Sequence, residues 1–184
     1  MPETAQDDGR GATPFVPVVR SVEPFDRFYA REFRSVVGLA YALSGSRSGA
    51  EDLAQEAFIA AHKQWAKIGA YDKPEAWVRR VVSNLSVSRF RRRASELKAM
   101  TRLAGFRSEH ATIGELPAEA GHFWAQVRRL PKRQAQAVAL HYLEDLPIAD
   151  IADILDCSPS TVKVHLHKGR QTLAERLDVQ GGVL

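Results

Sequence analysis

Apolar residues recur at three- and four-residue spacing in several separate stretches of this chain, which is the pattern of amphipathic helices. The clearest stretch spans residues 146–177 and holds two such patterns. One helix face carries Ile148, Ile151, Ala152 and Leu155, and a second carries Val162, Leu166, Leu173 and Leu177. Between them, Ser158 and Pro159 predict a helix start, because a serine hydroxyl caps free backbone N–H groups and proline suits the first helical position.

Two short helices joined at a tight turn predict a helix-turn-helix, in which the first helix supports a second that enters the DNA major groove. The outer face of the second helix carries Ser160, Thr161, Lys163, His165, His167, Lys168 and Arg170. Cations on that face suit phosphates and guanine edges. The alternative is an ordinary αα-hairpin with a solvated charged face. The capped helix start and the basic face favour the DNA interpretation.

Three longer helices are predicted nearer the N-terminus, over residues 25–43, 49–67 and 74–93. Ser48 and Glu51 have the spacing of a capping box, and Asp72 with Pro74 forms another helix-start signal. Helical patterns return near residue 117 and continue into the helix-turn-helix. No stretch predicts a strand.

The expected fold class is therefore all-α, with two small helical domains joined by a flexible linker. Residues 1–22 show little periodicity and are expected to form a flexible tail. The domains are expected at 23–94 and 117–180. Periodicity fades between them, which predicts a linker over 95–116.

Charge is distributed unevenly along the chain, whose net charge is +4. The helix predicted to begin at Pro74 carries Trp77 near its start and Arg79, Arg80, Asn84, Arg89, Arg91, Arg92 and Arg93 beyond it. A basic helix with aromatic residues can hold phosphates while the rings stack on unpaired bases. The alternative puts Trp77 in the core and uses the last arginines to complement the helix dipole. So many arginines exceed what the dipole needs.

Other chemistry has weak support in this sequence. The single cysteine, Cys157, cannot form an internal disulfide, which fits the cytoplasm, and we interpret it as a packing residue. No apolar run approaches the ~20 residues of a membrane span, and no signal-peptide core opens the chain. His165 and His167 point to different helix faces, so we expect no metal. Without a phosphate-binding glycine loop or a nucleophile–base pair, we expect neither an enzyme nor a cofactor.

Several short motifs follow one another in a definite order. They are Glu51-Asp52-Leu53-Ala54-Gln55-Glu56-Ala57-Phe58, Pro74-Glu75-Ala76-Trp77-Val78-Arg79-Arg80, Leu130-Pro131-Lys132-Arg133-Gln134, Leu143-Glu144-Asp145-Leu146 and Thr161-Val162-Lys163. Together they resemble the extracytoplasmic-function (ECF) sigma factors of bacterial RNA polymerase, and most closely the actinobacterial SigE group. The resemblance covers residues 24–177.

This resemblance implies a protein that binds core RNA polymerase and promoter DNA and selects promoters by their −10 and −35 elements. It implies polymerase contacts, on the clamp helices of the largest subunit, from Asp52, Gln55 and Glu56. It implies −10 contacts from Trp77, Arg79, Arg80, Asn84, Arg89 and Arg91. It implies −35 contacts from Ser160, Thr161, Lys163, Val164, His167 and Lys168. Many relatives are held by an anti-sigma factor, which makes one a candidate partner.

Two positions depart from many of these relatives. Val164 stands where serine is common, and valine can only touch a thymine methyl. Lys168 stands where arginine is common, and lysine lacks the bidentate contact. The alternative function is a stand-alone helix-turn-helix regulator that binds an operator as a dimer. That alternative explains the C-terminal helices but gives no role to the acidic helix or to the basic helix that begins at Pro74.

Overall fold

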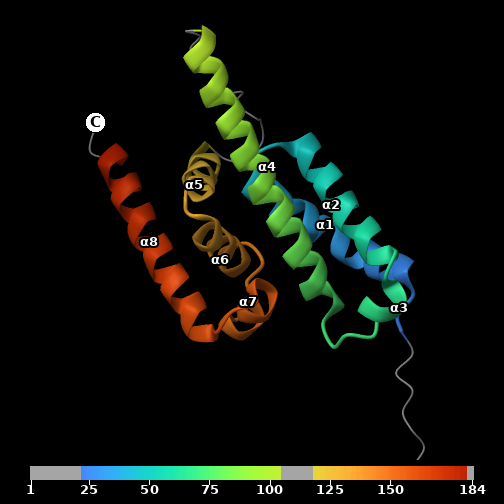
Figure 1. Ribbon diagram of the computed structural model, residues 1–184. Helices are drawn as coiled ribbons and strands as arrows, with labels where there is room; N and C mark the ends of the chain where they lie inside the picture. Colours follow the sequence, from blue (N-terminus) through green and yellow to red (C-terminus); the bar gives the residue numbers. More distant parts are fainter. Residues whose placement is uncertain (1–21, 105–117, 182–184) are drawn as a thin grey trace, which may run out of the picture.

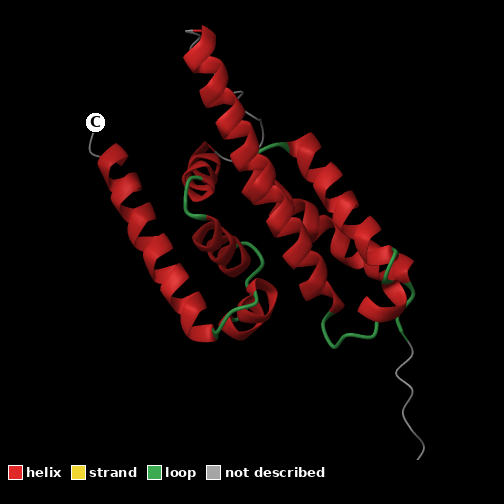
Figure 2. Ribbon diagram, viewed as in Figure 1, coloured by secondary structure: helices red, strands yellow, loops and turns green. Residues whose placement is uncertain are grey.

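The computed structural model describes residues 22–104 and 118–181, and these ranges contain helices, turns and loops without a strand (Figure 2). The helices are α1 (Phe25–Ser44), α2 (Arg47–His62), α3 (Trp65–Ile68), α4 (Pro74–Ala104), α5 (Ala118–Arg128), α6 (Lys132–Tyr142), α7 (Ile148–Leu155) and α8 (Pro159–Gly181). The prediction of an all-α fold is confirmed. The predicted tail up to residue 21 and the linker residues 105–116 lie outside the described ranges.

Helices α1, α2 and α4 form the core of the first unit, since each packs against the other two. The apolar stripe predicted on α1 is buried there, with Phe28, Val36 and Leu39 fully covered. The helix ends after Ser44 because Gly45 adopts a left-handed conformation, with φ of 71°, which L side chains rarely take. Its N–H then bonds to the carbonyl of Tyr41 at 2.8 Å.

The start of α2 differs from the prediction, because Ser46 rather than Ser48 caps the helix. Ser46 is extended, and its Oγ accepts a hydrogen bond from the backbone N–H of Gly49 at 3.3 Å. Since α1 ends so abruptly at Gly45, the chain can begin a new helix within two residues. Ser48 and Glu51 do have the spacing of a capping box, but the hydroxyl that accepts from a free N–H of α2 belongs to Ser46, two positions earlier.

The helix predicted over residues 49–67 is also divided, because α2 ends at His62 and α3 follows from Trp65. The ring of Trp65 lies 5.2 Å from that of Phe25 and 4.7 Å from that of Phe28. Its indole N–H also donates to the carbonyl of Glu23 at 2.9 Å. Burial of this aromatic ring against α1, together with its hydrogen bond, outweighs continuation of one straight helix.

Helix α4 is the longest element and continues to Ala104, beyond the predicted end at residue 93. Figure 1 shows its C-terminal part projecting past the other helices. In its first half, one face is packed into the core, where the side chains of Val78, Val82 and Val87 are buried. The second half has no comparable apolar stripe. It consists mainly of alanine, leucine, arginine, lysine and glutamate, which favour helix without tertiary contacts.

The second unit comprises α5 to α8, with α8 packed against α5, α6 and α7. Helix α6 is its centre, since residues 135–140 are all buried. The predicted inner face of the helix-turn-helix is confirmed, with Ile151 and Leu155 of α7 and Val162 and Leu166 of α8 buried.

The two units pack directly on one another, a relationship that apolar periodicity did not predict. Helix α1 contacts α5 and α6, and α4 contacts α6 and α7. In Figure 1, α5, α6 and α7 lie between α4 and α8. Buried residues of both units belong to one continuous apolar cluster. Among the described helices, none is long and apolar enough to span a membrane.

Candidate nucleic-acid interface

The turn between α7 and α8 is held by local hydrogen bonds that set the direction of α8. Asp156 takes a left-handed conformation with φ of 55°, and the N–H of Cys157 bonds to the carbonyl of Ala152. The Oγ of Ser158 then accepts from the backbone N–H of Thr161 at 3.2 Å, and Pro159 is the first residue of α8. The helix start predicted from this Ser-Pro pair is confirmed.

The outer face of α8 exposes most of the residues that resemblance assigned to −35 DNA. Those exposed are Ser160, Lys163, Val164, His167 and Lys168. Thr161 is half-buried, and its hydroxyl lies 2.8 Å from that of Ser158. Val164 is 49% exposed, so these residues combine the cations Lys163 and Lys168 with one apolar side chain. Such a surface can hold phosphates and contact a thymine methyl group.

The two histidines of α8 have different surroundings, as their spacing predicted. His167 is exposed, whereas His165 is half-buried. Burial, followed by the nearby cations Arg133 and Lys168, lowers the pKa of His165. This histidine is therefore held in its neutral form more strongly than an ordinary one. Within residues 22–104 and 118–181, no three histidine, cysteine or acidic side chains lie together in a possible metal site.

Helix α2 presents a compact acidic face. Asp52, Gln55 and Glu56 are all exposed, while Leu53 and Ala54 between them are buried. Residues three and four apart lie on the same side of a helix, which explains the separation. One turn further along the same face, Ile59 is 56% exposed. Sequence reasoning did not select Ile59, although its position three residues after Glu56 was a usable signal.

A groove of about 560 Å³ joins this acidic face to the basic part of α4. Its acidic wall includes Asp52 and Glu56, and its basic wall includes Arg89, Arg92 and Arg93. Arg89, which resemblance assigned to −10 DNA, thus lies on the α2 side of α4. Arg91 is exposed, and its charge contributes, after burial and Arg133, to lowering the pKa of Lys132 on α6.

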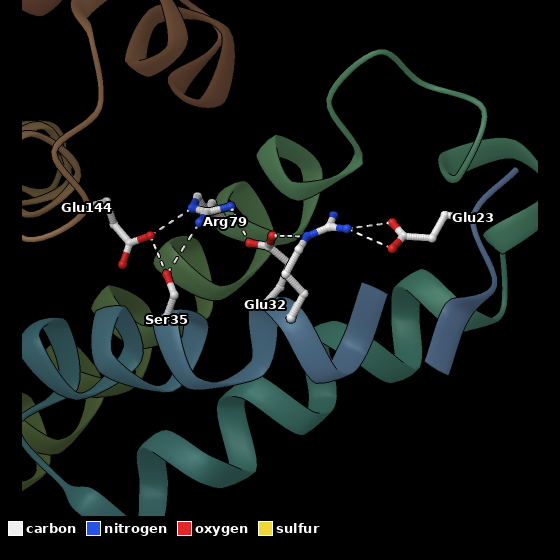
Figure 3. A network of polar contacts seen from close by, with 6 residues as sticks. Glu23, Glu32, Ser35, Arg79 and Glu144 are labelled. Atoms are coloured by element: carbon white, nitrogen blue, oxygen red, sulfur yellow. Dashed lines mark hydrogen bonds and ion pairs between the residues drawn. The ribbon is translucent and has the colours of Figure 1, made fainter. Parts of the chain in front are cut away.

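Arg79, by contrast, is enclosed by three polar side chains from α1 and from the loop before α7, which Figure 3 shows together. Its Nη1 lies 2.9 Å from Oε2 of Glu32 on α1, and its Nε lies 2.8 Å from Oε2 of Glu144 in the loop before α7. Ser35 of α1 donates to the same Glu144 oxygen at 2.5 Å. The side chains of Arg79 and Glu144 are only 11% and 6% exposed, so this pair is shielded from water.

Arg80 and Asn84 face the second unit as well. Nε of Arg80 donates to the carbonyl of Ile154 at 2.9 Å, and its Nη2 donates to the carbonyl of Asp153. These carbonyls lie in the last turn of α7, where the helix dipole favours a cation. Oδ1 of Asn84 accepts from Nε2 of the buried Gln136 on α6 at 2.9 Å. The structure therefore brings Arg79, Arg80 and Asn84 together but covers them with the second unit.

The loop that leads into α4 contributes an exposed aromatic residue. Tyr71 is 42% exposed, whereas Trp77 is half-buried and packs against the apolar core. The expectation that Trp77 contacts DNA thus competes with the alternative in which Trp77 belongs to the core. Tyr71 was not selected from the sequence, yet an aromatic residue three positions before a basic helix was a visible signal.

Comparison with known proteins adds a family description to this geometry. Residues 28–96 match the model of sigma-70 region 2, and residues 123–173 match that of sigma-70, region 4. These ranges overlap the two expected domains. They also coincide with the two packed units, since region 2 lies within α1 to α4 and region 4 within α5 to α8.

Individual relatives are similar over most of the chain. The ECF RNA polymerase sigma factor SigW of Bacillus subtilis is 28% identical over 151 residues, covering 76% of this chain and 81% of the relative. The ECF sigma factor SigE of Mycolicibacterium smegmatis is 29% identical over 168 residues, covering 83% of this chain and 61% of the relative.

One solved structure shares the arrangement of the helices. The sigma factor RpoE of Bartonella quintana, in complex with the anti-sigma factor NepR, aligns with a TM-score of 0.61 at 25% identity. The alignment covers 84% of this chain and 97% of that one. The likeness thus extends over both helical units.

Proposed function

The chain belongs to the extracytoplasmic-function family of RNA polymerase sigma factors, and we propose that three of its surfaces divide the work of promoter recognition. A sigma factor binds core RNA polymerase and directs initiation at promoters through their −10 and −35 elements. It is a non-catalytic initiation factor, and its site of action is the cytoplasm. A stand-alone regulator would need only α5 to α8, so the match to both sigma-70 regions favours the sigma factor.

The polymerase-binding surface in this proposal is the acidic face of α2, formed by Asp52, Gln55 and Glu56. All three side chains are exposed, so their carboxylates and amide face solvent and not the core. Exposed carboxylates steer a basic partner into register and contribute to affinity when they are desolvated. The clamp helices of the polymerase largest subunit, which the resemblance implied, supply such a partner.

The −10 surface lies along the start of α4 and the loop before it. Arg79 and Arg80 hold backbone phosphates, and Asn84 bonds to a base edge. Tyr71 joins these residues, because its exposed ring can stack on a base of the separated strand. Arg89 and Arg91, further along α4, continue the path of phosphate contacts. Trp77 supports the start of α4 from its half-buried position.

The −35 surface is the outer face of α8. Lys163 and Lys168 contact phosphates or base edges, and His167 lies exposed between them on the helix surface. Val164 contacts a thymine methyl group, because it has no polar atom to offer. Ser160 and Thr161 at the start of α8 can donate to a phosphate through hydroxyl or backbone N–H groups.

One observation carries the proposal most directly. Three residues that the family motif assigns to polymerase, Asp52, Gln55 and Glu56, all emerge on the exposed side of α2. An acidic face that served only solubility would have no reason to coincide with that motif. By similarity to the RpoE complex, we also propose an anti-sigma factor as a partner of this chain.

Run-off transcription with core polymerase on a set of genomic promoter fragments tests the function. We expect initiation that depends on the protein and is lost when Asp52, Gln55 and Glu56 are all replaced by alanine. Glu175→Ala is the control, since it removes an exposed carboxylate from α8, away from the acidic face of α2. Tight binding of the protein alone to duplex DNA, without polymerase-dependent initiation, would contradict the proposal.

A further inference from the structure

Two arginines of the basic helix α4 have no role in the proposed function. Arg92 and Arg93 follow Arg91 on this helix, and both are exposed. They line the groove of about 560 Å³ between α4 and α2, whereas Arg91 does not line it. Burial, followed by Arg133 and Arg91, lowers the pKa of Lys132 on α6, so the charge of Arg91 acts toward the second unit. The consecutive arginines of α4 therefore lie on different sides of the helix.

The groove is formed by one face of each of two helices. Helices α2 and α4 pack against each other and lie side by side in Figure 1. Residues three and four apart lie on the same side of a helix, so each face presents a regular series of side chains. The face of α2 comprises Gly49, Asp52, Leu53 and Glu56, and the face of α4 comprises Leu85, Ser88, Arg89, Arg92 and Arg93.

The charges in this groove are opposite in sign but unpaired. Asp52 and Glu56 share the groove with Arg92 and Arg93. Within residues 22–104 and 118–181, none of these four side chains forms an ion pair or a hydrogen bond. Because the packing of α2 on α4 fixes the two faces, each of these charges is available to a partner that enters the groove.

DNA suits such a groove poorly. A DNA backbone carries negative charge only, so a phosphate held by Arg92 would also approach Asp52 and Glu56, which repel it. A protein surface can carry both signs, with basic side chains opposite the carboxylates and acidic side chains opposite the guanidinium groups. Guanidinium groups also bind carboxylates through two parallel hydrogen bonds, which gives the contact a defined direction.

We propose that Arg92 and Arg93 are part of the polymerase-binding surface, and that the groove accepts a single polymerase surface of mixed charge. This inference rests on the proposed function, in which the acidic face of α2 binds polymerase. Basic side chains of the polymerase surface bind Asp52 and Glu56, and acidic side chains of the same surface bind Arg92 and Arg93. The second contact gives specificity, because a surface that is only basic is attracted by the α2 wall but repelled by the α4 wall.

The first measurement is the affinity of the labelled full-length chain for core polymerase in the absence of DNA. The test variant combines Arg92→Gln with Arg93→Gln, and a second variant combines Arg92→Lys with Arg93→Lys. The matched control combines Arg27→Gln with Arg34→Gln, which removes the same charge from exposed positions of α1. Far-UV circular dichroism checks that each variant keeps its helices.

We expect the double glutamine variant of α4 to bind core polymerase about ten-fold more weakly than its control, the order of two partly exposed ion pairs. The double lysine variant should lose less affinity, because it keeps the charge and lacks only the bidentate geometry. Equal affinities of the double glutamine variant and its control would overturn the proposal, since any loss would then follow from net charge alone.

The second measurement tests whether the two arginines bind DNA instead. Holoenzyme assembled with saturating core polymerase is titrated with promoter duplex at several salt concentrations. We expect the double glutamine variant of Arg92 and Arg93 to leave the slope of log affinity against log salt concentration unchanged. Arg91→Gln is expected to reduce that slope by about 0.9, as for the loss of one phosphate contact. A reduction of that size in the double glutamine variant would assign its arginines to phosphates and contradict the proposal.

One comparison separates this inference from the proposed function on which it rests. A variant that combines Asp52→Asn with Glu56→Gln is measured in the same DNA-free titration. If that variant binds weakly while the double glutamine variant of α4 binds normally, the polymerase-binding surface ends at α2 and only the inference fails. If both variants bind normally, the proposed function loses its polymerase-binding surface, and the inference fails with it.

Discussion

Nε of Arg79 donates a hydrogen bond to Oε2 of Glu144 at 2.8 Å across a separation of 65 residues in the sequence. One residue lies in the helix assigned to the −10 element, and the other lies in the loop that precedes the helix-turn-helix. The two promoter-reading units are therefore linked through two residues that each belong to one of the family motifs. Because of this link, the two units contact each other directly and are not joined only along the chain.

The cap of the recognition helix should contribute to stability. Ser158→Ala removes the acceptor of the Thr161 N–H and is expected to lower the free energy of unfolding by about 1 kcal/mol. Ser160→Ala is the control, because its hydroxyl pairs with that of Ser158 at 2.8 Å rather than with a backbone N–H at the start of α8. Urea denaturation of the two variants measures the difference. Equal losses would show that the cap does not hold α8.

The cations of α8 should determine the salt dependence of −35 binding. If Lys168 contacts a phosphate, Lys168→Ala reduces the slope of log affinity against log salt concentration by about 0.9. Val164→Ser should leave that slope unchanged and alter the preference for thymine at one position. Titrations of polymerase holoenzyme on promoter duplexes at several salt concentrations separate the two effects. An unchanged slope in Lys168→Ala would exclude the phosphate contact.

Tyr71 should act through its ring. Tyr71→Ala is expected to reduce initiation by about ten-fold, the order of one lost stacking contact, whereas Tyr71→Phe retains most activity. The side chain is 42% exposed, so neither variant should unfold the protein. Run-off transcription on linear and on pre-melted templates measures the effect. Rescue of Tyr71→Ala by a pre-melted bubble would assign the ring to strand separation, while equal activity of both variants contradicts a stacking role.

Ile59 should extend the polymerase-binding face of α2. Because its side chain is 56% exposed, Ile59→Ser is expected to leave the free energy of unfolding nearly unchanged. The same change should weaken binding to core polymerase by several-fold, since an apolar side chain beside Glu56 loses its contact. Affinity is measured by titration of labelled protein with core polymerase. A variant that binds normally would limit the interface to the acidic residues.

His165 should make stability fall in acid. Its pKa is lowered in the folded state by burial and then by Arg133 and Lys168, so the unfolded chain takes up the proton first. Stability is therefore lost as the pH falls through the ordinary histidine value of about 6.5 and levels off below the folded pKa. We expect His165→Gln to lose less stability than the unsubstituted chain over that interval. Denaturation at several pH values measures this, and parallel curves would contradict it.

Local patterns in the sequence predicted most of the helices and several of their ends. Gly45 and the Ser158-Pro159 pair mark ends and starts because backbone conformation and free N–H groups depend on neighbouring residues only. The exposed side of α2 followed from helix geometry in the same way. Family motifs then assigned the α2, α4 and α8 surfaces, and the sigma factor function that they implied is shown by the matched regions.

Other features escaped prediction because distant groups decide them. Trp65 does not continue α2 but packs into an aromatic cluster that includes Phe25, which is forty positions earlier. Ser46 takes the place of Ser48 as a cap because α1 ends where it does. The local sequence does not indicate the partners of Glu144 and Gln136, since a carboxylate or an amide in a helical protein can bond to many different groups.

The sequence by itself determined the helices, their inner faces and the order of the two units, because these depend on apolar spacing, capping and backbone freedom. Only the tertiary structure decided that Arg79, Arg80 and Asn84 are occupied while Lys163 and Val164 are exposed. Their chemistry suits DNA in either state. Which acceptor they meet depends on the packing of α6 and α7 against α4, and no local pattern records that packing.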